Sequence, residues 1–160
     1  KLSPAASDVR AIATAIEDAG ADAISAVNTL SGMAIDRHAR KPLLGNTYAG
    51  LSGPALKPVA LRVVYEVAQV VDIPIVAIGG VSSLEDVLDF LMAGACAVQV
   101  GTAVFADPVL PLRLIDELEA GISEAGSKLL GVDLVACATQ SYQRHPRRHF
   151  SLQSRPGPSA

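Results

Sequence analysis

Two apolar segments of this chain each stop on glycine, and this pattern suggests anion chemistry. Ile75–Ile78 is followed by Gly79-Gly80, and Ala97–Val100 is followed by Gly101-Thr102. Glycine at a strand end lets backbone N–H groups approach an anion closely, and a threonine hydroxyl adds another donor. Loops after the last two strands of (β/α) barrels form phosphate sites in this way. The two strand ends therefore predict a bound phosphate group, whose place a side chain at Gly80 or Gly101 would fill.

An ordinary pair of tight turns is the alternative explanation for these glycines. The repeated spacing and the hydroxyl of Thr102 favour the phosphate site. A G-x-G-x-x-G fingerprint is absent from the sequence, so a Rossmann-type dinucleotide site is unsupported.

Three further segments have side chains or backbone suited to a ligand. Lys1 ends a first strand and would place a fixed positive charge at the rim of a barrel, unless it is only an exposed terminus. Asn28-Thr29 follows a buried strand, and asparagine can both donate to and accept from a planar heterocycle, although it is also common in strand-end turns. Gly50–Pro54 precedes a helix and could hold a second part of a cofactor or only close a loop.

The remaining reactive residues favour no site. His38, Arg40 and Lys41 form a basic cluster, for which solvent exposure is the simpler explanation. Cys96 is expected in the core at a helix–strand junction. Cys96 and Cys137 show neither C-x-x-C spacing nor a histidine partner, so no metal site or disulfide framework is predicted.

Composition indicates an α/β protein of one domain. The chain has 160 residues, of which 50% are hydrophobic and 4% aromatic, and a net charge of −3. This charge gives no basis for nucleic acid or a membrane surface as partner. No segment is a signal peptide or a membrane span, and a cytoplasmic location is expected.

Helical and strand patterns alternate along the chain. Four helices are expected. The first is capped by Ser7 and ends at Gly20, and the second begins at Pro58, with Leu61, Val64, Tyr65 and Ala68 on one face. The third begins with a Ser82–Glu85 capping box and runs to Gly94, and the fourth runs from Asp107-Pro108 to about Ala120. The strands expected are Ala23–Val27, Ile73–Ile78 and Ala97–Val100, with a long loop over Ser31–Ala55.

This alternation predicts a parallel sheet built from about four βα units. Residues 19–24 also recur as residues 93–98, which fits the repeated unit of a barrel. A closed (β/α)8 barrel needs about 250 residues, so we expect half a barrel over residues 1–136, the C-terminal half if the phosphate site is correctly placed. Residues 137–160 are basic and aperiodic; disorder, a short basic arm or a non-native reading frame would each explain them.

Many ordered motifs make residues 1 to about 135 resemble dihydroorotate dehydrogenase, in particular the class 1, NAD-linked (type 1B) catalytic subunit. The motifs are Lys1–Pro4, Val27–Thr29, Lys41-Pro42, Gly50–Ala55, Lys57-Pro58, Ile73–Ile75, Gly79–Val81, Glu85–Val87 and Val98–Ala103.

The resemblance implies an FMN-binding TIM (β/α)8 barrel that oxidises dihydroorotate to orotate in pyrimidine (UMP) biosynthesis. A base takes the C5 proton while hydride passes from C6 to flavin N5. Lys1 would stabilise the reduced flavin, the Val27 backbone would line the flavin site, and Asn28 and Thr29 would bind the pyrimidine. The phosphate-bearing side chain of FMN would be held by Gly53, Gly79, Gly80, Gly101 and Thr102. The expected partners are a second subunit with FAD and a 2Fe–2S cluster, and further copies in a homo-oligomer.

Two departures from the family pattern limit this expectation. Ala49 stands where a second glycine is expected, and the cysteine that serves class 1 enzymes as base lies upstream of Lys1. Neither Cys96 nor Cys137 matches its motif, so no catalytic residue is assigned and the isolated chain is expected to be inactive. Two other functions stay open: a phosphate-binding barrel enzyme without flavin, and a non-catalytic binding or assembly module.

Overall fold

A parallel sheet forms the centre of the computed structural model, which describes residues 1–125, with side chains as far as residue 121. Its strands are β1 (Ile24–Ala26), β6 (Ile75–Ile78) and β7 (Ala97–Gln99), in the order β1-β6-β7. Leu2 adds a parallel bridge to Ala26 beside β1. The expected parallel order is confirmed, and the predicted tail at 137–160 lies outside the described residues.

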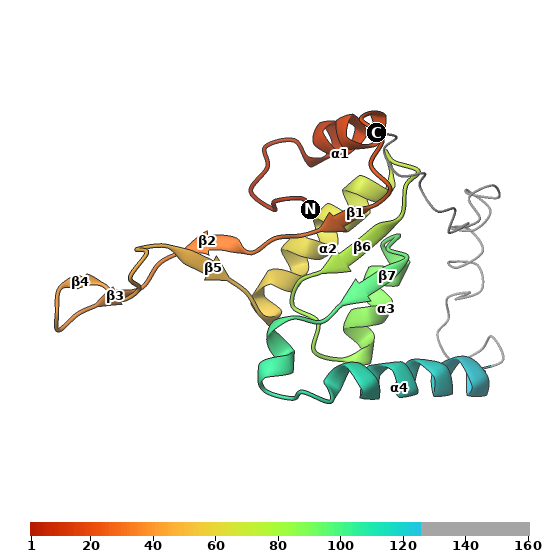
Figure 1. Ribbon diagram of the computed structural model, residues 1–160. Coiled ribbons are helices and arrows are strands. Elements are labelled where there is room, and N and C mark those ends of the chain that lie inside the picture. The colour runs from red at the N-terminus through yellow and green to blue at the C-terminus, as the bar shows by residue number, and fades with distance from the viewer. Residues whose placement is uncertain (126–160) are drawn as a thin grey trace, which may run out of the picture.

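Among the described residues, four α-helices accompany the sheet, and α2 and α3 lie behind it (Figure 1). They are α1 (Val9–Asp18), α2 (Lys57–Ala68), α3 (Leu84–Met92) and α4 (Leu110–Ala125), and two short 3-10 turns, η1 (Pro54–Leu56) and η2 (Thr102–Phe105), precede α2 and α4. On β1 and β6 the residues of one face are buried, and they share one hydrophobic core with Val63, Val67 and Phe90 of the helices, each 0% exposed. The core therefore lies between the sheet and its helices.

The buried face of α2 differs from the predicted one. Its buried residues are Ala60, Val63, Val64 and Val67, whereas Tyr65 is 58% exposed. The prediction is right for Val64 and wrong for Tyr65. The face of α2 that packs against the sheet runs through positions 60, 63, 64 and 67.

Both copies of the internal repeat make the same turn from helix to strand. Gly20 and Gly94 have φ of 88° and 109°. The next residue in each copy donates its N–H to the carbonyl oxygen five residues earlier, Ala21 to Ile16 at 3.2 Å and Ala95 to Phe90 at 3.0 Å. These are Schellman turns, for which a glycine with positive φ is preferred. The prediction that each copy joins a helix end to a strand is confirmed.

Two helix caps lie one residue later than predicted. Asp8, not Ser7, accepts the N–H of Ala11 and caps α1. In α3 the capping box joins Ser83 to Asp86, not Ser82 to Glu85. Helix α4 also begins at Leu110, beyond Asp107-Pro108, and extends past Ala120. Serine and acidic residues are adjacent at these positions, so sequence spacing alone did not select the residue that caps.

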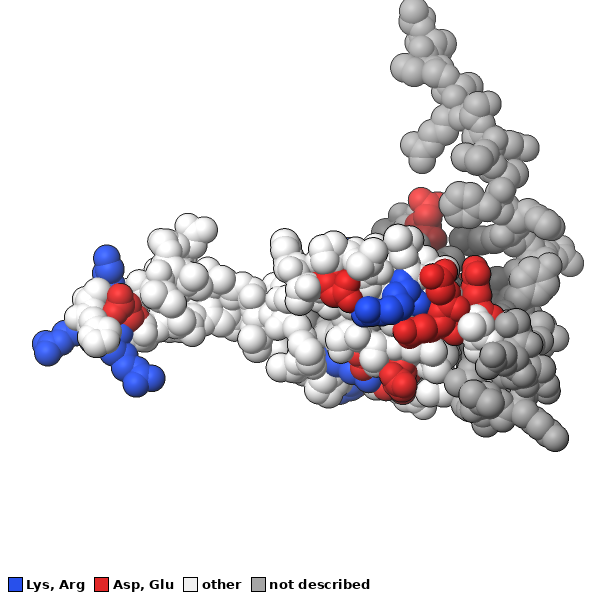
Figure 2. All heavy atoms as spheres, turned by 90° about the horizontal axis from the view of Figure 1, so that it is seen from below, with Lys and Arg blue, Asp and Glu red and all other residues white. Residues whose placement is uncertain are grey.

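The predicted loop over residues 31–55 is instead an arm of paired strands that projects from the body (Figure 1). Strand β2 (Leu30–Gly32) pairs with β5 (Ala49–Leu51), and β3 (Ile35–Asp36) pairs with β4 (Lys41–Pro42), both antiparallel. Basic side chains gather at its tip (Figure 2), where Arg37 and Arg40 are exposed. The expectation that the basic cluster is solvated is confirmed.

Cys96 is exposed, which contradicts its expected place in the core. It precedes β7, which forms one edge of the sheet within residues 1–125, so no further strand of that part of the chain covers it. Its thiol donates to the carbonyl oxygen of Ile75 at 3.3 Å, and partial burial raises the pKa of the Cys96 thiol. Within the described residues, no helix has the length and apolar character that crossing a membrane requires.

Candidate functional site

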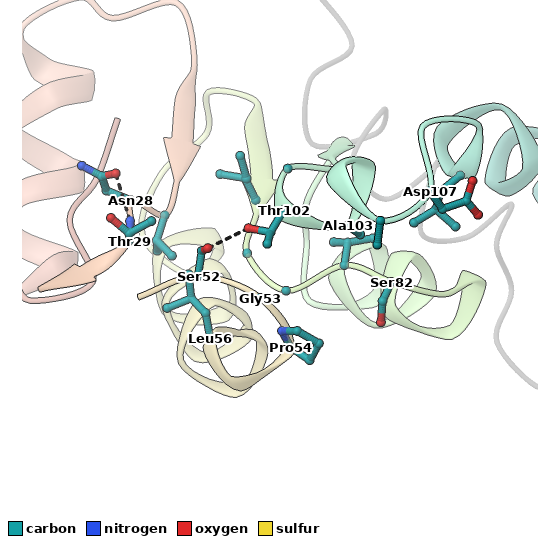
Figure 3. A pocket seen from close by; sticks show the side chains of 18 of the residues that line it. Asn28, Thr29, Ser52, Gly53, Pro54, Leu56, Ser82, Thr102, Ala103 and Asp107 are labelled. Atoms are coloured by element: carbon teal, nitrogen blue, oxygen red, sulfur yellow. Dashed lines mark hydrogen bonds between the residues drawn. The ribbon is translucent and has the colours of Figure 1, made fainter. Parts of the chain in front are cut away.

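A pocket of about 530 Å³ opens at the carboxyl ends of the parallel strands (Figure 3). Its volume falls in the range of small-molecule sites, about 300–1,000 Å³. Every site residue predicted from the sequence lines it: Lys1, Val27, Asn28, Thr29, Gly53, Gly79, Gly80, Gly101 and Thr102. Parallel strands bring their ends to one edge, which explains why segments distant in sequence meet here.

Two main-chain hydrogen bonds hold these strand ends together. Val27 donates its N–H to the carbonyl oxygen of Ile78 at 2.8 Å, and Asn28 donates to that of Leu2 at 2.8 Å. They fix the segments that carry Lys1, the start of the arm and the glycine turn after β6. The pocket wall is therefore continuous with the sheet.

The glycines at the strand ends differ in the space around them. A Cβ atom on Gly80 would lie 2.8 Å from both the oxygen of Gly53 and the nitrogen of Lys57, and φ at Gly80 is 76°. At Gly53 and Gly101 a Cβ atom would meet no atom within 4 Å. Gly80 is thus required by packing, whereas Gly101 borders open pocket space.

Free backbone donors accompany these glycines. Across the described residues, the N–H groups of Gly79, Gly80 and Gly101 donate to no backbone or side-chain acceptor. Gly79 is buried and Gly80 is half-buried, and N–H groups in such places normally find a partner, so these two successive unpaired donors suit an anion. This observation fits a phosphate group, so FMN, which carries one, is compatible with the residues present.

The hydroxyl of Thr102 has a partner within the protein. It donates to the hydroxyl oxygen of Ser52 at 2.7 Å (Figure 3), which joins the turn after β7 to the segment that precedes η1. Sequence reasoning named Gly50–Pro54 as a possible cradle but gave Ser52 no role. The signal in the sequence that could have identified Ser52 was its place between Gly50 and Gly53.

The pair Asn28-Thr29 lies where the arm leaves the body. The side-chain oxygen of Asn28 accepts the N–H of Thr29 at 2.9 Å. The side chain of Thr29 packs against the arm, because a Cβ atom on Gly50 would lie 2.2 Å from its hydroxyl oxygen. The amide nitrogen of Asn28 donates to no acceptor among residues 1–125 and can serve a ligand.

Three charged residues outside the pocket lining, Lys57, Asp86 and Asp89, form a cluster beside the glycine turn. Lys57 bonds the carboxylates of Asp86 and Asp89, the latter at 2.7 Å. Burial alone would raise the pKa of Asp86, but hydrogen bonds from Lys57 and from the backbone and hydroxyl of Ser82 outweigh it and lower the pKa to about 2. Hydrogen bonds to these carboxylates likewise raise the pKa of Lys57. In the sequence, the only signals for this cluster were the family motifs Lys57-Pro58 and Glu85–Val87.

Charge at the pocket comes from its rim. Arg113 of α4 donates to Asp107 at 2.6 Å, and both line the pocket, as does Lys1. In the part of the chain that the structure describes, no three His, Cys, Asp or Glu side chains are grouped closely enough to hold a metal ion.

Comparison with known proteins gives a consistent family match. The dihydroorotate dehydrogenase family model matches residues 1–122. The chain is 52% identical over 124 residues to the dihydroorotate dehydrogenase B (NAD(+)) catalytic subunit of Malacoplasma penetrans, and 54% identical over 126 residues to that of Bacillus cytotoxicus. These matches cover 78% and 79% of this chain but 40% and 41% of the relatives. The chain thus spans about two fifths of their length.

A solved structure agrees with the sequence comparisons. The crystal structure of DHODH from Eimeria tenella in complex with ferulenol matches with a TM-score of 0.62 and 28% sequence identity. The match covers 78% of this chain and 34% of that chain.

Proposed function

This chain belongs to the dihydroorotate dehydrogenase family, and we propose that it supplies the flavin-phosphate side of an enzyme that oxidises dihydroorotate to orotate in pyrimidine biosynthesis. The observation that supports this most is the convergence of the predicted site residues on one pocket at the strand ends. Curated relatives named as dihydroorotate dehydrogenase catalytic subunits support the same activity.

FMN is the cofactor that we propose for the pocket. The unpaired N–H groups of Gly79, Gly80 and Gly101 would hold its phosphate, and Gly53 would leave room beside them. When bound, FMN would supply the acceptor for the hydride that dihydroorotate loses. The hydroxyl of Thr102 would act mainly by fixing the turn through Ser52, since it donates to Ser52.

The other lining residues would orient the reacting groups. Lys1 would place its ammonium group against the polar edge of the flavin ring, where it stabilises negative charge. Val27 would contact the ring through its backbone. Asn28 and Thr29 would bind the pyrimidine, with the amide nitrogen of Asn28 donating to a carbonyl oxygen of the substrate.

We also propose a place in the barrel, a partner subunit, an oligomeric state and a cellular location. The placement in the C-terminal half of a (β/α)8 barrel rests on the position of phosphate loops after the last two strands of such barrels. A partner subunit with FAD and a 2Fe–2S cluster is proposed because the relatives are named catalytic subunits of the NAD(+) type. A homo-oligomer and a cytoplasmic location are proposed with it.

Flavin analysis of the full-length protein tests this function. We expect purified protein to be yellow and to release FMN on denaturation, and anaerobic dihydroorotate should bleach its visible band. Asn28→Ala should reduce this bleaching while FMN remains bound. A protein without flavin would favour the phosphate-binding barrel enzyme of another type. A flavoprotein that dihydroorotate never bleaches would favour a non-catalytic module.

A further inference from the structure

One buried carboxylate joins α2 to the turn that follows β6. Lys57 donates to Asp86 Oδ1. The other oxygen, Asp86 Oδ2, accepts the N–H of Ser82 at 2.8 Å, the hydroxyl of Ser82 at 2.9 Å and the N–H of Ser83 at 3.0 Å. Among the described residues, Asp86 is the only charged one that is buried, at 8% exposed. Its bonds therefore have little competition from water.

The same turn also touches the backbone of α2. A Cβ atom on Gly80 would lie 2.8 Å from the nitrogen of Lys57 and 2.9 Å from its Cβ atom. Gly80 thus rests on the first residue of α2, while Ser82 is bonded to the carboxylate that the Lys57 side chain holds. The turn over residues 79–83 thus packs on Lys57 at Gly80 and is bonded at Ser82 and Ser83 to Asp86, to which Lys57 donates.

The hydroxyl of Ser82 points away from the Ser52–Thr102 side of the pocket (Figure 3) and donates to Asp86. Ser82 lines the pocket, yet in this arrangement its hydroxyl proton serves the turn and not a ligand. The N–H groups of Gly79, Gly80 and Val81 in this turn donate to no acceptor among the described residues, so their direction depends on how firmly the turn is held.

We propose that Lys57 and Asp86 are positioning residues, which hold the Gly79–Ser83 turn so that its N–H groups face the phosphate of the flavin cofactor. This inference rests on the FMN site proposed above. A carboxylate that accepts several hydrogen bonds inside the protein is a rigid anchor, because each broken bond would leave a buried polar group unpaired. Preorganised N–H donors bind an anion more tightly than mobile ones, since less ordering accompanies binding.

Matched variants of neighbouring aspartates separate positioning from simple loss of charge. Asp86→Asn removes a carboxylate from Lys57 and weakens the bonds to Ser82 and Ser83, while Lys57 keeps Asp89 as a partner. Asp89→Asn also removes a carboxylate from Lys57, but Asp89 has no bond to the turn among the described residues. Lys57→Met removes the ammonium group that donates to Asp86 and so tests the same contact from the side of α2.

Binding of FMN and of riboflavin, which lacks the phosphate, is measured in the full-length apoprotein by flavin fluorescence. We expect the parent protein to prefer FMN. Asp86→Asn should weaken FMN binding about 10-fold, the effect of one weakened hydrogen bond to a charged group, and leave riboflavin binding unchanged. Asp89→Asn should change neither. The ³¹P resonance of bound FMN should shift in Asp86→Asn and stay in place in Asp89→Asn.

The outcomes separate this inference from the proposed function. If the parent prefers FMN and Asp86→Asn keeps the full preference and the ³¹P shift, the positioning role is wrong while the FMN site stands. Equal loss of FMN and riboflavin binding in a folded Asp86→Asn protein would also overturn it, because the turn would then not act on the phosphate in particular. If Asp86→Asn does not fold, the preference for FMN over riboflavin is measured in Lys57→Met instead, and the same outcomes decide. A parent protein that binds no FMN refutes both proposals.

Discussion

At the scale of single residues, the strand-end glycines divide into two kinds that the sequence could not separate. Gly80 has a positive φ of 76° and no space for a Cβ atom, because the backbone of Gly53 and Lys57 lies against it. Gly101 has a φ of −111° and open space around it. The expectation that a side chain at Gly80 would fill the phosphate position is therefore incomplete, since it would first displace the protein backbone.

This difference predicts opposite behaviour for two alanine variants of the full-length protein. Gly80→Ala should lower the stability of the apoprotein by about 1–3 kcal/mol or more, from backbone strain and the clash with Lys57. Gly101→Ala should leave apoprotein stability within about 0.5 kcal/mol but weaken FMN binding, because its Cβ atom enters the pocket. Urea unfolding and FMN titration measure the two effects. An unstable Gly101→Ala apoprotein would contradict the open space seen here.

The low pKa of Asp86 makes a prediction about acid stability. Its pKa is about 2 in the folded protein, compared with 3.8 ordinarily, so the stabilisation is fully present above about pH 4 and is lost as pH falls toward 2. The shift corresponds to about 2 kcal/mol. Asp86→Asn should therefore be less stable than the parent at pH 7, and the difference should shrink between pH 4 and pH 2. Urea unfolding across this range measures it, and a constant difference would argue against the shift.

At the scale of elements, the arm and the body meet at Thr29. Strand β5 passes the side chain of Thr29 so closely that only a glycine fits at position 50. Residue 50 pairs with Ser31 of β2, so the arm fixes the backbone just beyond Asn28. The arm thus helps to place the residues proposed to bind the pyrimidine, although most of it projects away from the central sheet and its helices (Figure 1).

Gly50→Ala should therefore affect the substrate more than the flavin. The added methyl group would push Thr29 and β5 apart, which should weaken orotate binding and leave FMN affinity nearly unchanged. Gly45→Ala is the matched control in the same arm, since a Cβ atom there meets nothing within 4 Å. Orotate titration followed by the flavin absorbance gives the comparison. Equal effects of the two substitutions would exclude this role of the Thr29 contact.

At the scale of the whole molecule, one face of the sheet has less cover than the other. Ser25, Val76 and Ala97 share a register row and are half-buried or exposed, whereas Ile24 and Ile75 on the other face are buried. Strand β7 also forms an open edge of the sheet. In relatives more than twice as long as the matched segment, further chain is available to cover such surfaces.

Expressed alone, the 160-residue chain should associate or lose fixed packing. Open strand edges and uncovered apolar surface both promote association. Sedimentation equilibrium should show a dimer or larger species, or else the chain should bind the dye ANS as partly folded proteins do. A monodisperse monomer that binds no ANS would mean that this chain is complete as a domain, contrary to the half-barrel prediction.

The sequence by itself determined the alternating βα order of the body and the strand-end residues Gly79, Gly80, Gly101 and Thr102 that line the pocket. Both follow from local rules: apolar runs that stop on glycine form strands with polar ends, and parallel strands bring those ends together. The repeated helix-to-strand turn could also be recognised, because a glycine with positive φ ends each helix. The resemblance to a family added the identity of the cofactor and substrate, which spacing did not supply.

Tertiary structure decided the features that depend on contacts between distant segments. The strands of the arm are only two or three residues long, too short for a periodic signal, and they exist because β2 and β5 pair across the arm. Cys96 proved to be exposed because the sheet ends at β7. The link from Lys57 to Asp86 joins residues 29 positions apart, and no local pattern reveals such a pair. Propensity acts within a few residues, whereas packing alone selects which distant side chains meet.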